Sequence, residues 1–400
     1  MDIGPVTIVA KGSALVYQVD FDLKGSHQQL WFEVDNLAQQ ELSSSGDTAL
    51  MALLLPAMLA NENIHVKGSV SERLLFSLNG AYQTILIQTI PYLQRVSITA
   101  EHSNTQSSAA TGVITGFSAG VDSFCTITDY FSDSPPKALK ITHLLYNNVG
   151  SHGPGEERLF RERYQQLKET ADTWQLPFIT VNSNMNDFYG RSLDFQLTHT
   201  LRNAAIPMLF QQFIGHFLYS SAYSYQDLFV GESYDMAFSD AFSMPLLATE
   251  SLQCYSVGSE HSRVEKTLRI SSNPDSYKVL DVCVKGDRAG NCSHCDKCLR
   301  TLLTLDLAGK LELYKDNFDL EVYQQHKQAF INEVLISKDP LLKEIVVWAK
   351  QQGYRFAAHH YLSATMLFLK RSPAKVFLLF KNQLKKLLSS LGLYHPKQYH

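Results

Sequence analysis

Four cysteines in the C-terminal half of the sequence have the spacing of a metal-binding cluster. They lie in DVCVKGDRAGNCSHCDKCLRTLL, where eight residues separate the first two cysteines and two residues separate each later pair. Four thiolates suit a tetrahedral Zn²⁺ ion and complete its coordination shell, so no position is left for water. Three cysteines within seven residues are improbable as ordinary reduced core residues. The pattern predicts a structural zinc site formed by Cys283, Cys292, Cys295 and Cys298.

A redox CxxC pair is the alternative interpretation of this cluster, but such a pair would not need Cys283 or Cys298. His294 lies between the cysteines, and we expect it to be exposed and not to coordinate the metal. Basic residues around the cluster would offset the negative charge of a four-thiolate centre, and they are Lys285, Arg288, Lys297 and Arg300.

A second candidate for chemistry is the stretch GFSAGVDSF, which follows the apolar run VIT and precedes a helical pattern. Small residues let backbone N–H groups approach a phosphate closely, and the following helix adds the positive end of its dipole. No lysine follows the glycine as in the Walker loop, and the stretch is not GxGxxG. The structural alternative is an ordinary helix N-cap. The pattern favours a phosphate-binding loop made of Ser118, Ala119, Gly120, Val121, Asp122 and Ser123.

This stretch resembles the SGGxDS loop of PP-loop ATP pyrophosphatases, with Ala119 in place of the first glycine. In that class the loop grips the β,γ-pyrophosphate of ATP while the α-phosphate is attacked. The alanine is a mild departure if position 119 does not need a positive φ angle, and it puts the loop in doubt if it does. The resemblance implies ATP and Mg²⁺ as ligands, with Asp122 helping to hold the ion through oxygen or water ligands.

The loop and the cysteine cluster together resemble the 7-cyano-7-deazaguanine synthase family over about residues 112–310. That family combines a PP-loop with a C-terminal zinc site of this cysteine spacing. The chain does not match the family's deazaguanine pocket, so the acceptor substrate stays open. Further matches are the pair Arg202-Asn203, the turn Gly231-Glu232-Ser233, the PLL at Pro245 to Leu247, and the segment Ser262 to Lys266.

The resemblance implies an ATP-dependent ligase, an amidating or nitrile-forming synthase, that adenylates a carboxylate or amide and releases pyrophosphate. The nitrogen donor would be free ammonia, a partner's ammonia or an amine, because the sequence carries no glutaminase signature. Asp122 and Ser123 are the expected catalytic residues of the loop. Arg263 and Lys266 are candidates to stabilise charge on the phosphates. We expect Arg202 either to stabilise charge on the phosphates as well or to anchor a helix.

Two other functions are compatible with the motifs. A degenerate PP-loop domain could bind nucleotide and serve as an assembly module, which Ala119 favours and the intact Asp122 and Ser123 disfavour. A tRNA- or nucleoside-modifying thiolase of the same superfamily would need a reactive cysteine pair away from zinc. Cys125 and Cys254 are the only cysteines outside the cluster, and nothing in their sequence context marks them as reactive.

These residues must be positioned by alternating strands and helices, which imply an α/β fold with a doubly wound parallel sheet of the PP-loop (HUP) type. Right-handed crossovers are expected. DSFCTITDYF and EERLFRERYQQLKETADTWQL read as helices, and LRNAAIPMLFQQFIGHFLYSSAYSY reads as one long apolar helical region. The expected strands are VITGF, THLLYNNVG, PFITVNSN and DLFVGES.

The remaining sequence predicts two flanking domains. Residues 1–108 read as a small α+β domain with a helix over 47–60 despite its proline, and 102–111 as a polar linker. The catalytic domain would span 109–310, and a helical extension would span 311–400. In the N-terminal domain the expected strands are VTIVA, ALVYQVDFDL, QQLWFEV, HVKGSV, TILIQT and RVSITAEH.

Composition and charge limit which partners and which location we expect for the protein. The 400 residues include 45% hydrophobic and 18% charged residues, with a formal net charge of −4, so nucleic acid is not an expected partner. The N-terminus does not resemble a signal peptide, and the apolar stretches are too short to span a bilayer, so we expect a cytoplasmic protein. We also expect a homo-oligomer.

The C-terminal tail, residues 355–400, carries eight basic residues and no acidic one. Such a segment can lie on an anionic membrane or dock on an acidic partner. We favour the simpler expectation that it packs on the chain's own acidic surface.

Overall fold

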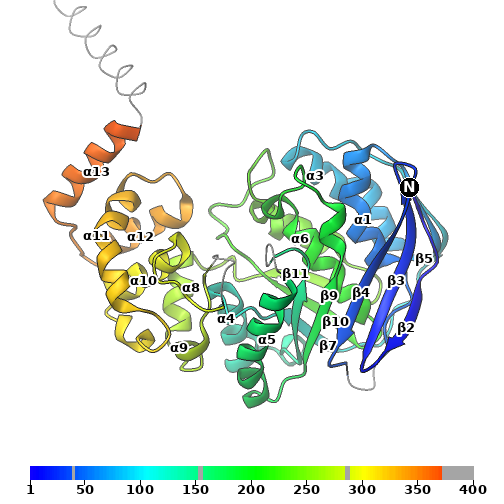
Figure 1. Cartoon of the computed structure of the whole chain (residues 1–400), viewed down its shortest axis with the longest axis horizontal. Coiled ribbons are helices and arrows are strands. Elements are labelled where there is room, and N and C mark those ends of the chain that lie inside the picture. The colour runs from blue at the N-terminus through cyan, green and yellow to red at the C-terminus, as the bar shows by residue number, and fades with distance from the viewer. Residues whose placement is uncertain (38–40, 152–155, 284–288, 372–400) are drawn as a thin grey trace, which may run out of the picture. The chain divides into compact units, whose positions relative to one another are not determined.

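The computed structural model describes residues 1–37, 41–151, 156–283 and 289–371 (Figure 1). The chain divides into two compact units, Met1–Asp319 and a second unit that begins at Leu320. The first unit is an α/β structure built on a large, mixed and mostly parallel open sheet with flanking helices. The second unit is helical and contains α11 (Leu320–Ile336), α12 (Pro340–Gln351) and α13 (Ala358–Arg371), with α11 packed against both of the others.

Five parallel strands form one half of the sheet, in the order β11-β10-β7-β8-β9. Most of their residues are buried, as expected for a parallel sheet covered by helices. The strands are β7 (Gly112–Gly116), β8 (His143–Asn148), β9 (Phe178–Ser183), β10 (Ile214–Ser220) and β11 (Gln253–Val257). The helices of this half are α4 (Val121–Ile127), α5 (Glu156–Thr173), α6 (Phe195–Ala205), α7 (Asp240–Ser243), α8 (Arg263–Ile270), α9 (Ser276–Val279) and α10 (Asp296–Leu307).

The N-terminal strands continue the same sheet, because β4 pairs antiparallel with β9, with Phe32 opposite Ser183. Figure 1 shows β4 beside β9, where the blue strands meet the green ones. The expected N-terminal and catalytic domains therefore lie in one compact unit. Its other strands and α-helices are β1 (Asp2–Ile3), β2 (Thr7–Lys11), β3 (Ala14–Leu23), β4 (Ser26–Asp35), β5 (Ile64–Ser71), β6 (Ile98–Asn104), α1 (Asp47–Ala60), α2 (Glu72–Ser77) and α3 (Gln83–Thr89).

Helix α1 forms much of the core between the N-terminal strands and α6. The expected helix over residues 47–60 is present, and Pro56 lies inside it. Twelve of its residues are buried, so the helix is apolar on every side. This burial offsets the backbone hydrogen bond that proline cannot donate.

Two expected strands are absent at their predicted positions. Residues 84–89 (TILIQT) belong to helix α3, and 227–233 (DLFVGES) form no strand in the described chain. The fourth parallel strand is β10, inside the segment that we expected to be one long helix. The helix α6 ends at Ala205 and a 3₁₀ turn containing Pro207 follows before β10. Continuous apolar sequence does not distinguish a buried helix from a buried strand, which explains the error.

The basic tail falls largely outside the described residues. Of its eight basic residues, those after Arg371 belong to the segment 372–400, which the structure does not describe. Among the described helices, none combines the length and the apolar character that crossing a bilayer requires. On α13, the exposed apolar side chains are Tyr361, Leu362, Met366 and Leu369.

Candidate active site

The predicted phosphate loop lies at the place in the sheet where the strand order reverses. The chain passes from β7 to β8 and β9 in one direction, then returns to β10 on the other side of β7. The loop Ser118–Ser123 follows β7 and enters α4, and β10 runs parallel to β7 so that both end at the same edge. In open α/β sheets, ligands bind in the crevice at this edge.

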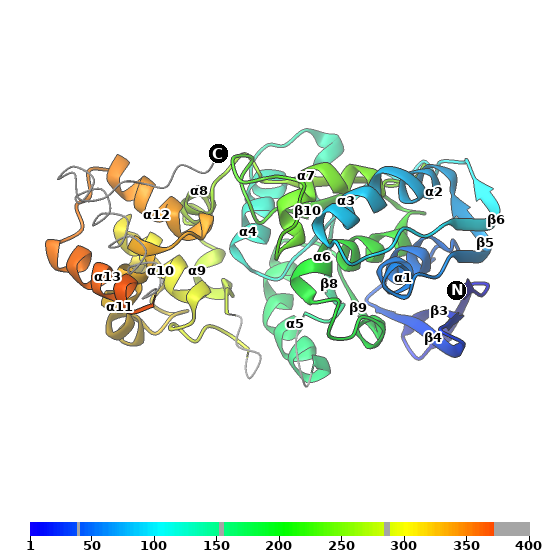
Figure 2. The same ribbon diagram turned by 90° about the horizontal axis from the view of Figure 1, so that it is seen from above.

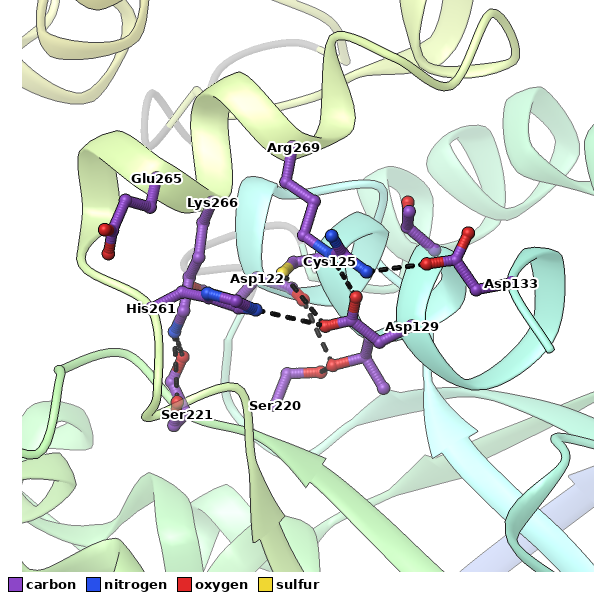
Figure 3. A network of polar contacts seen from close by, with 12 residues as sticks. Asp122, Cys125, Asp129, Asp133, Ser220, Ser221, His261, Glu265, Lys266 and Arg269 are labelled. Carbon is purple, nitrogen blue, oxygen red and sulfur yellow. Dashed lines mark hydrogen bonds and ion pairs between the residues drawn. The ribbon is translucent and has the colours of Figure 1, made fainter. Parts of the chain in front are cut away.

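Asp122, in the first turn of α4, is bound by two basic residues of α8. Arg263 Nη2 donates to Asp122 Oδ2 at 2.7 Å, and Lys266 Nζ lies 3.4 Å from Asp122 Oδ1. Lys266 also donates to the Ser221 carbonyl at 2.6 Å and to its hydroxyl at 3.0 Å, just beyond β10 (Figure 3). Three expected site residues, Asp122, Arg263 and Lys266, therefore meet between the ends of β7 and β10.

The environment of this group is largely desolvated. Lys266 is 1% exposed, whereas the Asp122 side chain is 25% exposed. Burial lowers the pKa of Lys266, and the charge of Asp122 opposes this shift. Electrostatic interactions with a ligand are stronger in such a site than on an open surface.

Local sequence explains why α8 presents these two residues. Ser262 caps the helix by accepting from the Glu265 backbone N–H at 3.2 Å, and the Glu265 carboxylate accepts from the Ser262 N–H at 2.7 Å. This capping box fixes the first turn of the helix. Residues three apart share a helical face, so Arg263 and Lys266 project together. Helix α8 also packs against α4 (Figure 2).

Ala119 adopts a left-handed conformation, which bears on how well the loop matches the SGGxDS pattern. Its φ angle is 55°, so this position does favour glycine. The residue is fully buried, and its carbonyl accepts a hydrogen bond from the Asp281 N–H at 2.9 Å. Ser123 is also buried and its hydroxyl donates to the Gly120 carbonyl at 3.1 Å, while Ser118 is exposed. The loop therefore holds Ala119 in a conformation that costs backbone strain energy.

Replacing Ala119 by glycine is expected to leave stability unchanged or to raise it by up to about 1 kcal/mol. Relief of the left-handed strain, about 1–2 kcal/mol, opposes the larger unfolded-state entropy of glycine. Ala204→Gly is the matched control, because Ala204 is equally buried but lies inside α6. It should lose about 1 kcal/mol or more. Urea denaturation of both variants checks this, and an equal loss in both would refute strain at position 119.

Arg202, which we expected either to bind nucleotide or to anchor a helix, makes its hydrogen bonds with protein groups of the first unit. It is 1% exposed on α6 and lies 3.8 Å from the centre of the Tyr189 ring. The neighbouring Gly150 has φ +99°, and a side chain there would clash with the guanidinium. The contacts of Arg202 match the expectation that it anchors a helix. It donates to Thr198 Oγ1 at 2.8 Å, the Val149 carbonyl at 2.9 Å, Asn186 Oδ1 at 2.8 Å and the Leu193 carbonyl at 3.2 Å.

A buried polar network on α6 was not foreseen from the sequence. His199 Nε2 lies 3.0 Å from Asp235 Oδ1, and its Nδ1 lies 2.7 Å from the Tyr219 hydroxyl. Burial opposes the charged imidazole, but the hydrogen bond and charge of Asp235 outweigh it and raise the pKa of His199. The sequence gives no sign of this pairing, because its partners are 36 residues apart.

Asp240, at the start of α7, is a second buried acidic residue that contacts α6, and its titration can be tested by varying pH. Its carboxylate accepts from Thr200 Oγ1 at 2.7 Å, and burial raises its pKa from 3.8 to about 6. The native state therefore binds this proton more tightly than the unfolded state, and the contribution of Asp240 to stability falls as pH rises from about 4 to about 7. The two pKa values correspond to at most roughly 3 kcal/mol.

We expect Asp240→Asn to remove this part of the pH dependence. The variant should gain stability relative to the unmodified chain as pH rises through this range, since asparagine can still accept the Thr200 hydrogen bond. Thermal melts of both proteins at several pH values measure the difference. Parallel curves would contradict the raised pKa of Asp240.

The four cysteines come together as the sequence predicted. Their Sγ atoms all lie within 4.8 Å of one another, and Cys292 Sγ is 3.9 Å from Cys298 Sγ. This agrees with the edge of a tetrahedron with Zn–S bonds of about 2.3 Å, and it is far longer than a disulfide bond of about 2.0 Å. The Cys295 N–H points at Cys292 Sγ at 3.2 Å, at the start of α10. The cluster could hold a metal ion.

Residues around the cluster connect it to the phosphate loop. Asp281 precedes the first cysteine by two residues, accepts from the Cys283 N–H at 3.1 Å, and donates its own N–H to Ala119. His294 is partly buried, and its Nδ1 lies 2.7 Å from the Cys292 carbonyl, outside the thiol cluster. The expected charge-balancing residues Lys285 and Arg288 lie outside the described residues.

Comparison with protein-family models, with curated proteins and with solved structures finds no match to this chain. The class of this protein is therefore described from its fold and its site. The first unit is an α/β open-sheet structure with a polar site at its strand-order reversal and a four-cysteine cluster beside it.

Proposed function

We propose that the chain is an ATP pyrophosphatase of the PP-loop class with a doubly wound nucleotide-binding sheet. It would transfer AMP to a carboxylate or amide acceptor, release pyrophosphate, and use a structural zinc ion held by the four cysteines. The observation that carries this proposal is the contact of Asp122 with Arg263 and Lys266, beyond the ends of β7 and β10. Polyphosphates commonly bind at this position of an open α/β sheet.

The charges of Asp122, Arg263 and Lys266 suit a nucleoside triphosphate. Two cations surround one carboxylate, so phosphate oxygens could take over the contacts that Arg263 and Lys266 now make with Asp122. Asp122 would then supply an oxygen ligand for Mg²⁺, which would neutralise part of the triphosphate charge. Arg263 suits bidentate phosphate recognition, and Lys266 adds a localised charge in a desolvated place.

The reaction follows from which phosphates the loop holds. If the loop binds the β- and γ-phosphates, the α-phosphate faces the acceptor. An acceptor oxygen then forms a bond to the α-phosphorus, the bond to the bridging oxygen of the β-phosphate breaks, and pyrophosphate leaves with that electron pair. Ammonia or an amine can next displace AMP from the activated carbon and lose a proton.

The thiolase alternative receives less support from the two remaining cysteines. Cys125 and Cys254 are buried, and burial raises the pKa of both thiols, to about 12 for Cys254. A thiol must ionise to act as a nucleophile. A degenerate nucleotide-binding module would bind ATP but release no pyrophosphate, whereas the proposed enzyme would do both. Measuring pyrophosphate release therefore distinguishes the two.

Nucleotide binding tests the proposal without knowledge of the acceptor. Lys266→Met should weaken binding of Mg²⁺–ATP by about 10- to 100-fold, the usual cost of one charged hydrogen bond. Methionine keeps the side-chain length and removes the charge. Lys278→Met on α9 is the control, because Lys278 is exposed. Isothermal titration calorimetry measures both, and equal affinities would argue against a phosphate at Lys266.

A further inference from the structure

A second group of metal-ligating side chains lies one helical turn beyond the phosphate loop. It consists of Cys125 on α4, Asp129 in the turn that continues this helix, and His261 in the loop before α8. Cys125 and Asp129 are four residues apart and so share one helical face. His261 comes from a distant part of the sequence and approaches the same carboxylate (Figure 3). The group is separate from the four-cysteine cluster.

The geometry of this group fits a tetrahedral ion. The Cys125 Sγ lies 3.5 Å from Asp129 Oδ2, and His261 Nε2 lies 3.8 Å from the same oxygen. All three ligand atoms lie within 4.8 Å of one another. Bonds of about 2.3 Å to sulfur and about 2.0 Å to nitrogen and oxygen give ligand separations of about 3.3–3.5 Å. Small side-chain movements are enough to complete the site.

The two oxygens of Asp129 have different partners, which leaves one oxygen for an ion. Arg269 Nε donates to Oδ1, and Arg269 also binds Asp133 at 2.6 Å. Oδ2 faces Cys125 and His261. A carboxylate fixed by an arginine on one oxygen and aimed at an ion with the other is the arrangement expected of an oriented ligand.

We propose that Cys125, Asp129 and His261 bind a second divalent transition-metal ion of the zinc class. A thiolate, an imidazole and a carboxylate select such ions over Mg²⁺ or Ca²⁺, which prefer oxygen ligands alone. Three protein ligands leave a fourth position for water or substrate, in contrast to the closed four-cysteine shell. The ion would also join α4 to the loop that leads into Arg263 and Lys266. The proposal does not depend on the function proposed above.

Metal stoichiometry of the full-length chain tests this site. The protein is purified without chelators, loaded with Zn²⁺ or Co²⁺, freed of excess ion, and analysed for metal and protein content. We expect two ions per chain in the unmodified protein and in Cys254→Ser, whose cysteine is buried but outside both groups. Cys125→Ser and His261→Gln should each hold one. With Co²⁺, Cys125→Ser should also lose part of the thiolate-to-metal charge-transfer absorption.

Cys125 is buried, so its replacement risks misfolding the protein. The His261 side chain is 28% exposed, and His261→Gln therefore tests the same site with less risk to folding. Circular dichroism confirms that each variant is folded. One ion per chain in the unmodified protein would overturn the proposal, because the three side chains then form a hydrogen-bonded network only. Two ions in both ligand variants would overturn it as well.

Discussion

Cys298→Ser should lose the metal ion of the four-cysteine cluster and destabilise the surrounding part of the first unit. Cys298 is fully buried on α10, and serine replaces a thiolate by a hydroxyl that does not ionise. Binding of a structural zinc ion is coupled to folding, with apparent free energies of about 10–16 kcal/mol in small zinc domains. The loss should reach the phosphate loop, since Asp281 joins the cluster to Ala119.

The measurement combines metal content with thermal unfolding. Cys254→Ser is the matched control, because Cys254 is buried but lies outside the cluster. It should keep its metal and melt close to the unmodified chain, whereas Cys298→Ser should melt many degrees lower. A chelator should lower the melting temperature of the unmodified chain in the same direction. Cys298→Ser with unchanged metal content and melting would refute a structural metal at this cluster.

Asp122→Ala should reduce ATP turnover by about two to three orders of magnitude, the usual cost of one preorganised electrostatic contact. Removing this carboxylate also frees Arg263 and Lys266 for the phosphates. Binding of ATP should therefore persist while turnover falls, the opposite of the Lys266→Met result. Ser123→Ala should also reduce turnover by about two to three orders of magnitude, again without unfolding the protein.

Asp172→Asn provides the control for the loss of an acidic residue. Asp172 is exposed on α5 and pairs with Lys168 at 2.6 Å. Its turnover should match that of the unmodified chain. A loss of turnover in the Asp172 variant equal to that in Asp122→Ala would mean that net charge, and not this site, controls the rate.

Sequence reasoning was most successful where residue type and spacing alone define a site. The cysteine spacing predicted a cluster that the structure assembles. The family resemblance singled out Asp122, Arg263 and Lys266 as candidate site residues, and the structure places them in contact. The strands β7, β8 and β9 were also predicted, because each is a short apolar run bounded by turn residues.

The errors arose where tertiary contacts decide the outcome. Strand β10 was mistaken for helix because an apolar run has no period that separates the two structures. The pairing of β4 with β9 was also not expected, since local sequence does not determine which strands pair. Nothing in the sequence singles out His199, and only the fold brings Asp235 to it. The positive φ of Ala119 likewise appears only in the folded loop.

The identity of the nucleotide products tests the central claim most directly. The chain, or the Asp122→Ala variant, is incubated with Mg²⁺ and ATP labelled at the α- and γ-phosphates, with ammonia and candidate carboxylate or amide acceptors. A loop that holds the β- and γ-phosphates predicts labelled AMP and labelled pyrophosphate in equal amounts, both lost in the variant. ADP and inorganic phosphate as the main products, abolished by the same substitution, would contradict the account, because the loop would then direct attack at the γ-phosphate.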